Sequence, residues 1–290
     1  METINLDTPP ADGLLSKQAR QPVLKIRPAL PWGEWVEIWA YRELLWTLAL
    51  RDLRLRYRQT ALGVLWVVFQ PVAGAGIFAV VFGWVAGFSG GEPRYFLYSL
   101  AGLLGWNAFQ STLSKASMSI IGNGPLVSKV YFPRLLLPFA TVFSTLVDFI
   151  LGVLVFLGTA LLSDWRPSFA LAMVPLWLAC GLLMALGTGL LAASVMTRFR
   201  DVQHVLPMLL PFMMYATPVA YALKEVPAAW RWWFEINPMS WVIEGMRAGF
   251  LGREGVPAAW GAYSVGMSVF VFGLGLFSFR RMERSLNDVL

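Results

Sequence analysis

The stretch that decides the fold is RDLRLRYRQTALGVLWVVFQP, residues 51–71. Four arginines fall within its first eight residues, and the chain then carries no charged residue until Glu92. An uncharged apolar run of this kind exceeds the roughly 20 residues that a helix needs to cross a bilayer. Arginines directly before such a run are typical of a cytoplasmic flank. The stretch therefore predicts a membrane protein whose first crossing begins beside a cationic cluster.

The composition of the 290-residue chain agrees with a membrane protein. Hydrophobic residues make up 57% of it and charged residues only 14%, well below the roughly 25% of soluble domains. The net charge of +6 lies in segments between apolar blocks, so we expect anionic lipid headgroups, and not nucleic acid, as its partner. The single cysteine, Cys180, can form no intrachain disulfide. We do not expect the polar N-terminus to be a cleaved signal peptide, because it has no apolar core.

Six apolar segments are predicted to cross the membrane, so the expected fold class is an all-α membrane protein with six transmembrane helices. They are residues 61–88, 95–113, 135–162, 169–197, 205–222 and 258–279. Asn107 and Gln110 dilute the second segment, and Pro207, Pro211 and Pro218 interrupt the fifth. With the N-terminus inside, seventeen of the 23 Lys and Arg lie on the cytoplasmic side and six outside. Both termini are therefore predicted to be cytoplasmic.

Two segments precede the first span. Residues 1–31, which several prolines interrupt, are expected to form a polar cytoplasmic leader. Residues 32–58 are predicted to form an amphipathic helix in the cytoplasmic interface. At 100° per residue, a sector of about 60° gathers its apolar side chains: Trp35, Trp39, Trp46, Leu50, Leu53 and Tyr57. Three arginines of the cluster share a second sector and are expected to reach lipid phosphates. A soluble helix packed on a partner protein remains the alternative.

The longer connections carry further signals. Residues 114–134 contain the turn sequence Gly122-Asn123-Gly124-Pro125 between two short helical stretches. Apolar residues beside this turn favour a segment that docks on a cytoplasmic partner over a plain solvated loop. The sequence RFRD at 198–201 is a second candidate contact.

The external segment 223–257 is predicted to form two short helices that dip into the outer interface. Asn237 is a good N-cap, and Pro238 suits the first position of a helix. Gly249 and Gly252 are plausible ends for that helix.

Motifs for catalysis are missing from the sequence. It contains no G-x-x-x-x-G-K-[ST] loop for nucleotide phosphates. It has no clustered Cys or His, so we expect no metal site. His204, the single histidine, is expected to make an interfacial contact and not to act as a catalytic base. The chain is therefore not expected to be an enzyme on its own, and a partner or a gradient must supply the energy.

Two features inside the predicted spans are candidates for a functional role. Asp148 is the only acid near the middle of an apolar block, and the same blocks offer it no basic partner. We favour a hydrogen bond between helices over a proton relay, although an intramembrane carboxylate is a functional candidate by default. Trp66, Phe69 and Gln70 closely follow the arginine cluster and are candidates to line a path for sugars. An interfacial aromatic belt is the alternative reading of these rings.

Four segments together resemble the membrane permeases of ABC-2 type polysaccharide exporters, which export O-antigen, teichoic acid and capsule. The segments are RDLRLRYRQTALGVLWVVFQP, LVSKVYFPRLLLP, TRFRDVQHVLPMLLPFMMYATPV and INPMSWVIEGMRAGFLG. The resemblance runs from about Trp32 to the C-terminus and leaves out residues 1–31. It implies that residues 59–290 form an ABC-2 type transmembrane domain, with 32–58 as its interface helix and 223–257 as its outer gate helices.

The resemblance also implies the partners. Such permeases form homodimers in the bacterial inner membrane, and each subunit docks on a separate ATP-binding subunit. ATP and Mg would lie on that partner, so that the chain itself binds no cofactor. The substrate would be a lipid-linked glycan, usually on undecaprenyl diphosphate.

Four groups of residues receive roles by this resemblance and by the patterns above. The candidates to meet the substrate diphosphate at an entry gate are Arg51, Arg54, Arg56, Tyr57 and Arg58. The candidates to line the channel are Trp66, Phe69, Gln70 and Tyr215. The candidates for coupling to the ATPase are Ser119, Ile120, Gly122, Asn123, Gly124, Pro125, Arg198, Arg200 and Asp201. The candidates for the outer gate are Asn237, Pro238, Trp241 and Glu244.

The leading hypothesis is an export channel subunit for a lipid-linked polysaccharide such as O-antigen. An ABC-2 permease for lipid or drug efflux is the alternative within the same superfamily. A proton-coupled carrier would need Asp148 for transport, and a membrane enzyme of glycan assembly would need an acidic or metal site that the sequence does not offer.

Overall fold

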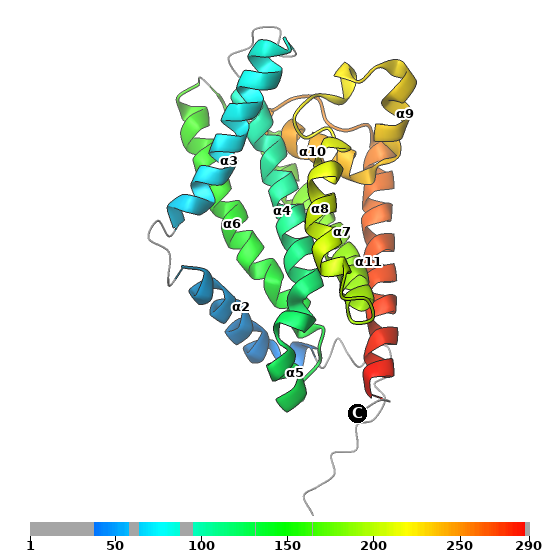
Figure 1. Cartoon of the computed structure of the whole chain (residues 1–290). Coiled ribbons are helices and arrows are strands. Elements are labelled where there is room, and N and C mark those ends of the chain that lie inside the picture. The colour runs from blue at the N-terminus through cyan, green and yellow to red at the C-terminus, as the bar shows by residue number, and fades with distance from the viewer. Residues whose placement is uncertain (1–37, 58–63, 88–94, 131, 164, 288–290) are drawn as a thin grey trace, which may run out of the picture.

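The computed structural model describes residues 38–57, 64–87, 95–130, 132–163 and 165–287, and these form helices and turns without a strand. The expected leader 1–31 and the first part of the expected interface helix lie outside the described residues. The helices run side by side as an elongated bundle, with α2 across one end and α9 at the other (Figure 1).

The elements follow one another as helices joined by short connections. They are α2 (Arg42–Tyr57), α3 (Val64–Phe78), η2 (Ala79–Val85), α4 (Tyr95–Gly122), α5 (Gly124–Lys129), α6 (Leu136–Leu161), η3 (Phe169–Met173), α7 (Val174–Met196), α8 (Val202–Tyr215), η4 (Leu223–Glu225), α9 (Ala228–Ile236), α10 (Pro238–Leu251) and α11 (Ala258–Asn287). The π-helical turn η2 continues α3, which holds Pro71 in its interior.

Within the described residues, four helical segments are long and apolar enough to cross a membrane: Leu65–Val85, Leu136–Leu161, Phe169–Met196 and Ala258–Arg284. They correspond to the first, third, fourth and sixth predicted spans. The second predicted span belongs to α4, which is longer than expected and continues to Gly122. The fifth corresponds to α8, a shorter apolar helix.

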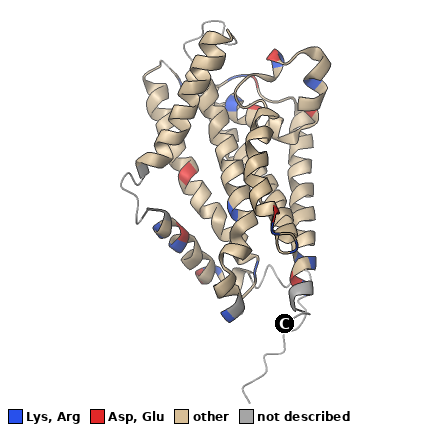
Figure 2. Ribbon diagram, viewed as in Figure 1, with Lys and Arg blue, Asp and Glu red and all other residues tan. Residues whose placement is uncertain are grey.

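Charged side chains gather toward the two ends of the bundle, and the middle of the ribbon is mostly tan (Figure 2). This distribution suits a bilayer, whose hydrocarbon core penalises charge. One end holds α2, α5 and the C-terminal part of α11, and α9 lies at the opposite end (Figure 1).

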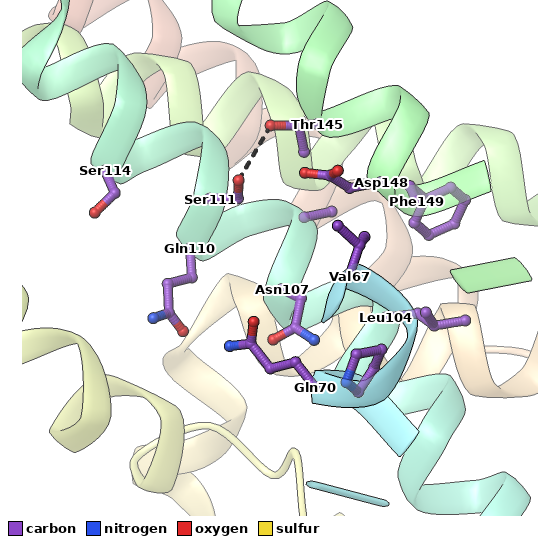
Figure 3. Close-up of a pocket in the computed structure, with 12 residues that line it drawn as sticks. Val67, Gln70, Leu104, Asn107, Gln110, Ser111, Ser114, Thr145, Asp148 and Phe149 are labelled. Atoms are coloured by element: carbon purple, nitrogen blue, oxygen red, sulfur yellow. Dashed lines mark hydrogen bonds between the residues drawn. The ribbon is translucent and has the colours of Figure 1, made fainter. Parts of the chain in front are cut away.

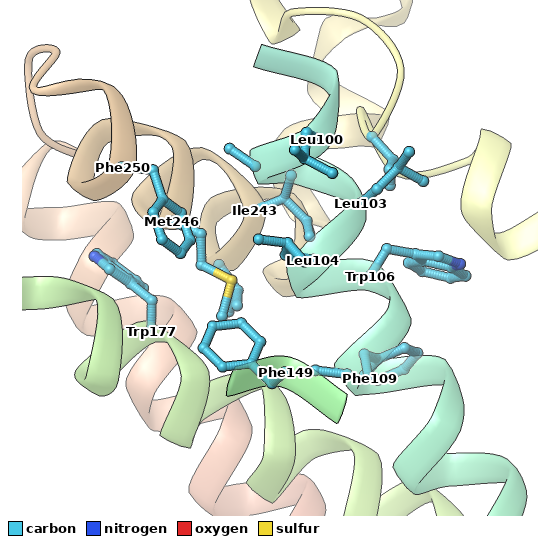
Figure 4. Close-up of a cluster of buried hydrophobic side chains, with 14 of the residues drawn as sticks. Leu100, Leu103, Leu104, Trp106, Phe109, Phe149, Trp177, Ile243, Met246 and Phe250 are labelled. Carbon is cyan, nitrogen blue, oxygen red and sulfur yellow. The ribbon is translucent and has the colours of Figure 1, made fainter. Parts of the chain in front are cut away.

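The main core forms around α4, which packs against α3, α6, α7 and α10. Trp106 and Phe109 of α4, Trp177 of α7, and Ile243 and Phe250 of α10 belong to one buried cluster (Figure 4). Although α10 was expected at the outer interface, most of its residues are buried, five of them in this cluster. The helix is therefore part of the protein interior.

A second buried cluster joins the elements at the opposite end. Leu48 and Ala49 of α2 pack with Ile120 of α4, Leu136 of α6 and Phe279 of α11. This end of the bundle is therefore one packed unit, in which α2 is held against the transmembrane helices.

Helices α7 and α11 make the closest approach in the bundle, through glycines. A Cβ atom on Gly275 of α11 would overlap the backbone of Gly187 on α7, whereas one on Gly273 would meet nothing within 4 Å. Small residues at such contacts let membrane helices pack backbone to backbone, where dispersion forces drive association.

We expect Gly275→Ala to destabilise the protein by about 1–3 kcal/mol, because the added methyl group must push α11 away from α7. Each kcal/mol should lower the melting temperature of the detergent-solubilised protein by about 2–4 °C. Gly273→Ala is the matched control on the same helix and should leave the melting temperature unchanged or slightly raised. Equal melting temperatures for the two variants would contradict this packing.

Candidate functional site

The arginine cluster divides into residues with different surroundings. Arg51 is half-buried, and its Nη2 donates to Asp52 Oδ1 at 2.9 Å and to Asn123 Oδ1 at 2.8 Å. Arg54 is exposed. Arg56 and Tyr57 are placed as part of the helix, but the structure does not describe their side chains, and Arg58 lies outside the described residues. Arg51 thus joins α2 to a distant segment, whereas Arg54 faces away from the bundle.

The partner of Arg51 belongs to the expected coupling segment. Asn123 stands between α4 and α5, and its Nδ2 donates to the carbonyl oxygen of Ser119 at 2.8 Å. Its backbone carbonyl accepts from Leu126 and Val127, the first turn of α5. Asn123 therefore ties α2, the end of α4 and α5 together.

The other coupling candidates lie at the same turn or in the short connection between α7 and α8. Ser119 and Ile120 are buried, and Gly122, Gly124 and Pro125 form the turn itself. Arg198, Arg200 and Asp201 are exposed in the connection. Gly122 and Pro125 are also exposed, so both connections offer surface for a partner.

A polar pocket of about 220 Å³ lies between α3, α4 and α6 (Figure 3). Its lining residues are Val67, Gln70, Pro71, Leu104, Asn107, Ala108, Gln110, Ser111, Ser114, Thr145, Asp148 and Phe149. The two residues that diluted the second predicted span, Asn107 and Gln110, both belong to it. The polar face of α4 is therefore used to build a pocket inside the bundle.

The amides that line the pocket differ in their hydrogen bonds. Gln110 Oε1 accepts from Trp106 Nε1 at 2.8 Å. The side-chain amides of Gln70 and Asn107 find no hydrogen-bond partner in the part of the chain that the structure describes. Figure 3 shows these two side chains next to each other at the pocket.

The channel-lining candidates lie on two helices. Trp66 and Phe69 are 58% and 57% exposed on α3. Their rings stack with centroids 5.7 Å apart. Gln70 is one turn after Trp66 on the same side of α3 and reaches the pocket. Tyr215 is exposed at the end of α8.

Asp148 has a basic partner, which corrects the sequence-based expectation of an isolated carboxylate. Lys115 Nζ lies 3.5 Å from Asp148 Oδ2 and donates to Ser144 Oγ at 2.9 Å. Lys115 was assigned to the cytoplasmic flank, but α4 continues to Gly122 and brings it beside α6. The pair joins α4 to α6 and weakens the case for Asp148 as a lone proton relay.

The outer-gate candidates fix α10 to its neighbours. Asn237 caps the helix as predicted, since its side chain accepts from the backbone N–H of Met239 at 3.0 Å, and Pro238 occupies the first turn. Trp241 is buried and stacks on Trp260 of α11, with ring centroids 4.9 Å apart. The helix ends at Gly252 in the left-handed conformation, with φ of 64°, and not at Gly249.

Arg247 is the residue that the sequence reasoning missed. It is 1% exposed, and its Nη1 donates to Glu244 Oε1 at 2.9 Å, to Tyr98 Oη at 2.8 Å and to the carbonyl oxygen of Pro218 at 2.8 Å. Its Nη2 donates to the carbonyl oxygen of Val219. The guanidinium also lies 3.9 Å from the ring centroid of Tyr98.

This arrangement ties α10 to α4 and to the connection after α8. The signal in the sequence was the Glu244–Arg247 pair, one helical turn apart within an apolar helix. Because Arg247 was counted as a charge of an external loop, its burial was not predicted.

The described residues contain no candidate metal site, because no group of three or more His, Cys, Asp or Glu comes together there. The helices form an apolar bundle with a pocket that several polar side chains line. One end of the bundle is packed and carries two exposed turns. The long apolar helices define the class of a multi-pass membrane protein.

The family follows from comparison with known proteins. Residues 43–251 match the ABC-2 type transporter family, and the chain belongs to this family. Its members are transmembrane subunits of transporters, and the chain is a multi-pass protein of the bacterial inner membrane.

Three relatives share modest identity over most of the chain. The O-antigen export system permease protein RfbA of Klebsiella pneumoniae is 26% identical over 241 residues, 81% of this chain and 91% of the relative. RfbA of Myxococcus xanthus is 28% identical over 216 residues, 74% of this chain and 82% of the relative. The polysialic acid transport protein KpsM of Escherichia coli is 24% identical over 241 residues, 80% of this chain and 92% of the relative.

We expect Arg247→Met to destabilise the protein by about 3–5 kcal/mol, because it leaves Glu244 and several buried carbonyl oxygens without their cationic partner. Thermal unfolding in detergent and the amount of protein in the membrane measure this loss. Arg253→Met is the control, since Arg253 is exposed and lies farther from the ring of Tyr98, at 5.3 Å. Unchanged stability of Arg247→Met would show that the buried guanidinium is dispensable.

Proposed function

We propose that the chain is the channel subunit of an ATP-driven exporter that moves a lipid-linked polysaccharide such as O-antigen across the inner membrane. The observation that carries this proposal is the set of relatives. They align over most of their own length, and the names of all three give polysaccharide export or transport as their function. The polar pocket supports a hydrophilic cargo over the alternative of lipid or drug efflux.

The proposed assembly is a homodimer with two ATP-binding subunits, which hold ATP and Mg. The turn between α4 and α5 and the connection 198–201 would dock on these subunits. The bond between Arg51 and Asn123 supports this role, because it would pass a displacement of the coupling turn directly to α2. In this arrangement Arg51 links the coupling turn to α2 and transmits motion between them.

The proposed entry gate is the arginine cluster, where the diphosphate of an undecaprenyl-linked glycan would arrive. Arg54 supports this part of the proposal, because its side chain is exposed, and guanidinium groups bind phosphate through charge-assisted hydrogen bonds. Arg56, Tyr57 and Arg58 follow it along the chain.

The proposed topology has six spans and both termini in the cytoplasm, with α4 and α8 as the second and fifth spans. The helices α9 and α10 would form the outer gate. Trp230, Trp232 and Trp233 are exposed on α9, as expected for a helix at the membrane–water interface. Arg247 would hold α10 in place while α9 moves.

Deletion of the gene should abolish the surface polysaccharide of the producing strain and leave lipid-linked glycan on the cytoplasmic side. In this strain, the double variant Arg54→Gln, Arg58→Gln should restore export at least about a hundredfold less well than the native protein. The reason is that each lost charge-assisted hydrogen bond costs about 1.5–3 kcal/mol, and 1.4 kcal/mol corresponds to a factor of ten. Quantifying surface glycan by immunoblot or gel staining measures this effect.

Arg42→Gln, which removes an exposed charge from the start of α2, is the matched control and should restore export fully. Full export by the double variant would exclude the diphosphate role. Normal surface glycan in the deletion strain would refute the export function itself.

The topology can be mapped with single cysteines, because Cys180 is the one native cysteine and is buried. We expect a cysteine at Lys224 to react with a membrane-impermeant maleimide in intact spheroplasts. Cysteines at Arg200 and Arg284 should react only after the membrane is permeabilised. Labelling at Arg200 in intact cells would contradict the proposed orientation.

A further inference from the structure

We propose that the polar pocket between α3, α4 and α6 is a saccharide-binding site, in which one sugar unit of the exported chain is held by the amides of Gln70 and Asn107. This inference rests on the proposed export function and adds a specific contact site to it. It extends the channel-lining expectation for Gln70 to a defined pocket that also includes Asn107.

The first argument is the free hydrogen-bonding capacity of the pocket. Neither Gln70 nor Asn107 has a side-chain partner in the described part of the chain, and each amide offers two donors and one acceptor. Gln70 is exposed and Asn107 half-buried on helices of a membrane protein, and polar groups without partners are costly where the bilayer supplies no water. The pocket therefore requires a polar occupant in the working protein, either water or a ligand.

The second argument is the chemistry of the lining. Amides of Gln70, Asn107 and Gln110, hydroxyls of Ser111, Ser114 and Thr145, and the carboxylate of Asp148 face a cavity of about 220 Å³. Hydroxyl groups of a sugar both donate and accept hydrogen bonds, so they match a lining that offers both donors and acceptors. A lipid chain would leave these groups unsatisfied, which argues against an apolar occupant.

The third argument is the position of the aromatic pair. Trp66 lies one turn before Gln70 on the same side of α3, and its ring is stacked with that of Phe69 at the surface. Gln70 is itself exposed, so the pocket is open to the surface that carries these rings. A glycan that passes over the aromatic rings would meet the amides of the pocket next.

The fourth argument is that the charges at the pocket are already compensated. Lys115 lies 3.5 Å from Asp148, and it also donates to Ser144. The carboxylate can therefore accept from a neutral ligand without requiring a cation, which favours a sugar hydroxyl over a metal ion or a basic drug. The ion pair also fixes α4 against α6.

The test is photo-crosslinking in the producing strain with the complete transporter. The photoreactive residue benzoylphenylalanine replaces Asn107 or Gln70 in the pocket, Trp66 on the aromatic surface, or Leu154, which is exposed on α6 away from the pocket lining. The probe is the strain's own lipid-linked glycan. After irradiation, periodate-based staining of the isolated permease reports covalently attached sugar. Gln70 serves as a second pocket position because, being exposed, it tolerates a larger side chain.

We expect attached glycan at Asn107, Gln70 and Trp66, and at most a trace at Leu154. Glycan at Trp66 alone would overturn the pocket site and leave the proposed export function standing. Glycan at none of the four positions would overturn both. Equal attachment at Leu154 would also overturn the site, because it would reflect contact with the lipid carrier from the bilayer.

A pair of substitutions separates binding from folding. Asn107→Leu keeps the size of the side chain and removes its hydrogen bonds, so export should fall about tenfold while the amount of permease in the membrane stays unchanged. Asn107→Gln keeps the amide and should retain export within about twofold of the native rate. Equal export by the two variants would overturn the proposal.

Discussion

A bilayer supplies no water to polar groups, and this constraint governs the whole structure. Many hydroxyl side chains on the long helices donate to carbonyl oxygens of their own helix, as Ser119 does to Ala116 at 2.7 Å and Thr188 does to Met184 at 2.8 Å. The buried guanidinium of Arg247 instead collects carbonyl oxygens from a neighbouring connection. Among the described residues, the amides of Gln70 and Asn107 have no such partner, and neither do a few buried atoms elsewhere, such as Ser99 Oγ and Thr112 Oγ1.

The apolar spans were predictable because their signal is local. Composition alone identified the four long segments, and the cap of α10 followed from the dipeptide Asn237-Pro238. The length of α4 was not predictable from apolar content, because its last part is polar. That part stays helical since Lys115 finds Ser144 and Asp148 on α6. The helix boundary therefore depended on a neighbour that the local sequence does not reveal.

The candidate site was predictable in its parts but not in its connections. Arg51 and Asn123 were placed in different functional groups, and the structure joins them by a hydrogen bond across 72 positions of the sequence. Arg247 was counted as an external charge, although it is among the most deeply buried residues. Long-range pairs of this kind carry no periodicity and no spacing rule, so single-sequence reasoning had no means to propose them.

The pairing of Lys115 with Asp148 has a consequence for the electrical behaviour of the protein. A lone ionised carboxylate within the membrane would experience a force from the transmembrane potential, worth about 2.3 kcal/mol per 100 mV for a full crossing. Two opposite charges 3.5 Å apart sum to zero, so the voltage does almost no work on them when the helices move together. This ion pair therefore contributes polarity to the bundle without adding net charge to it.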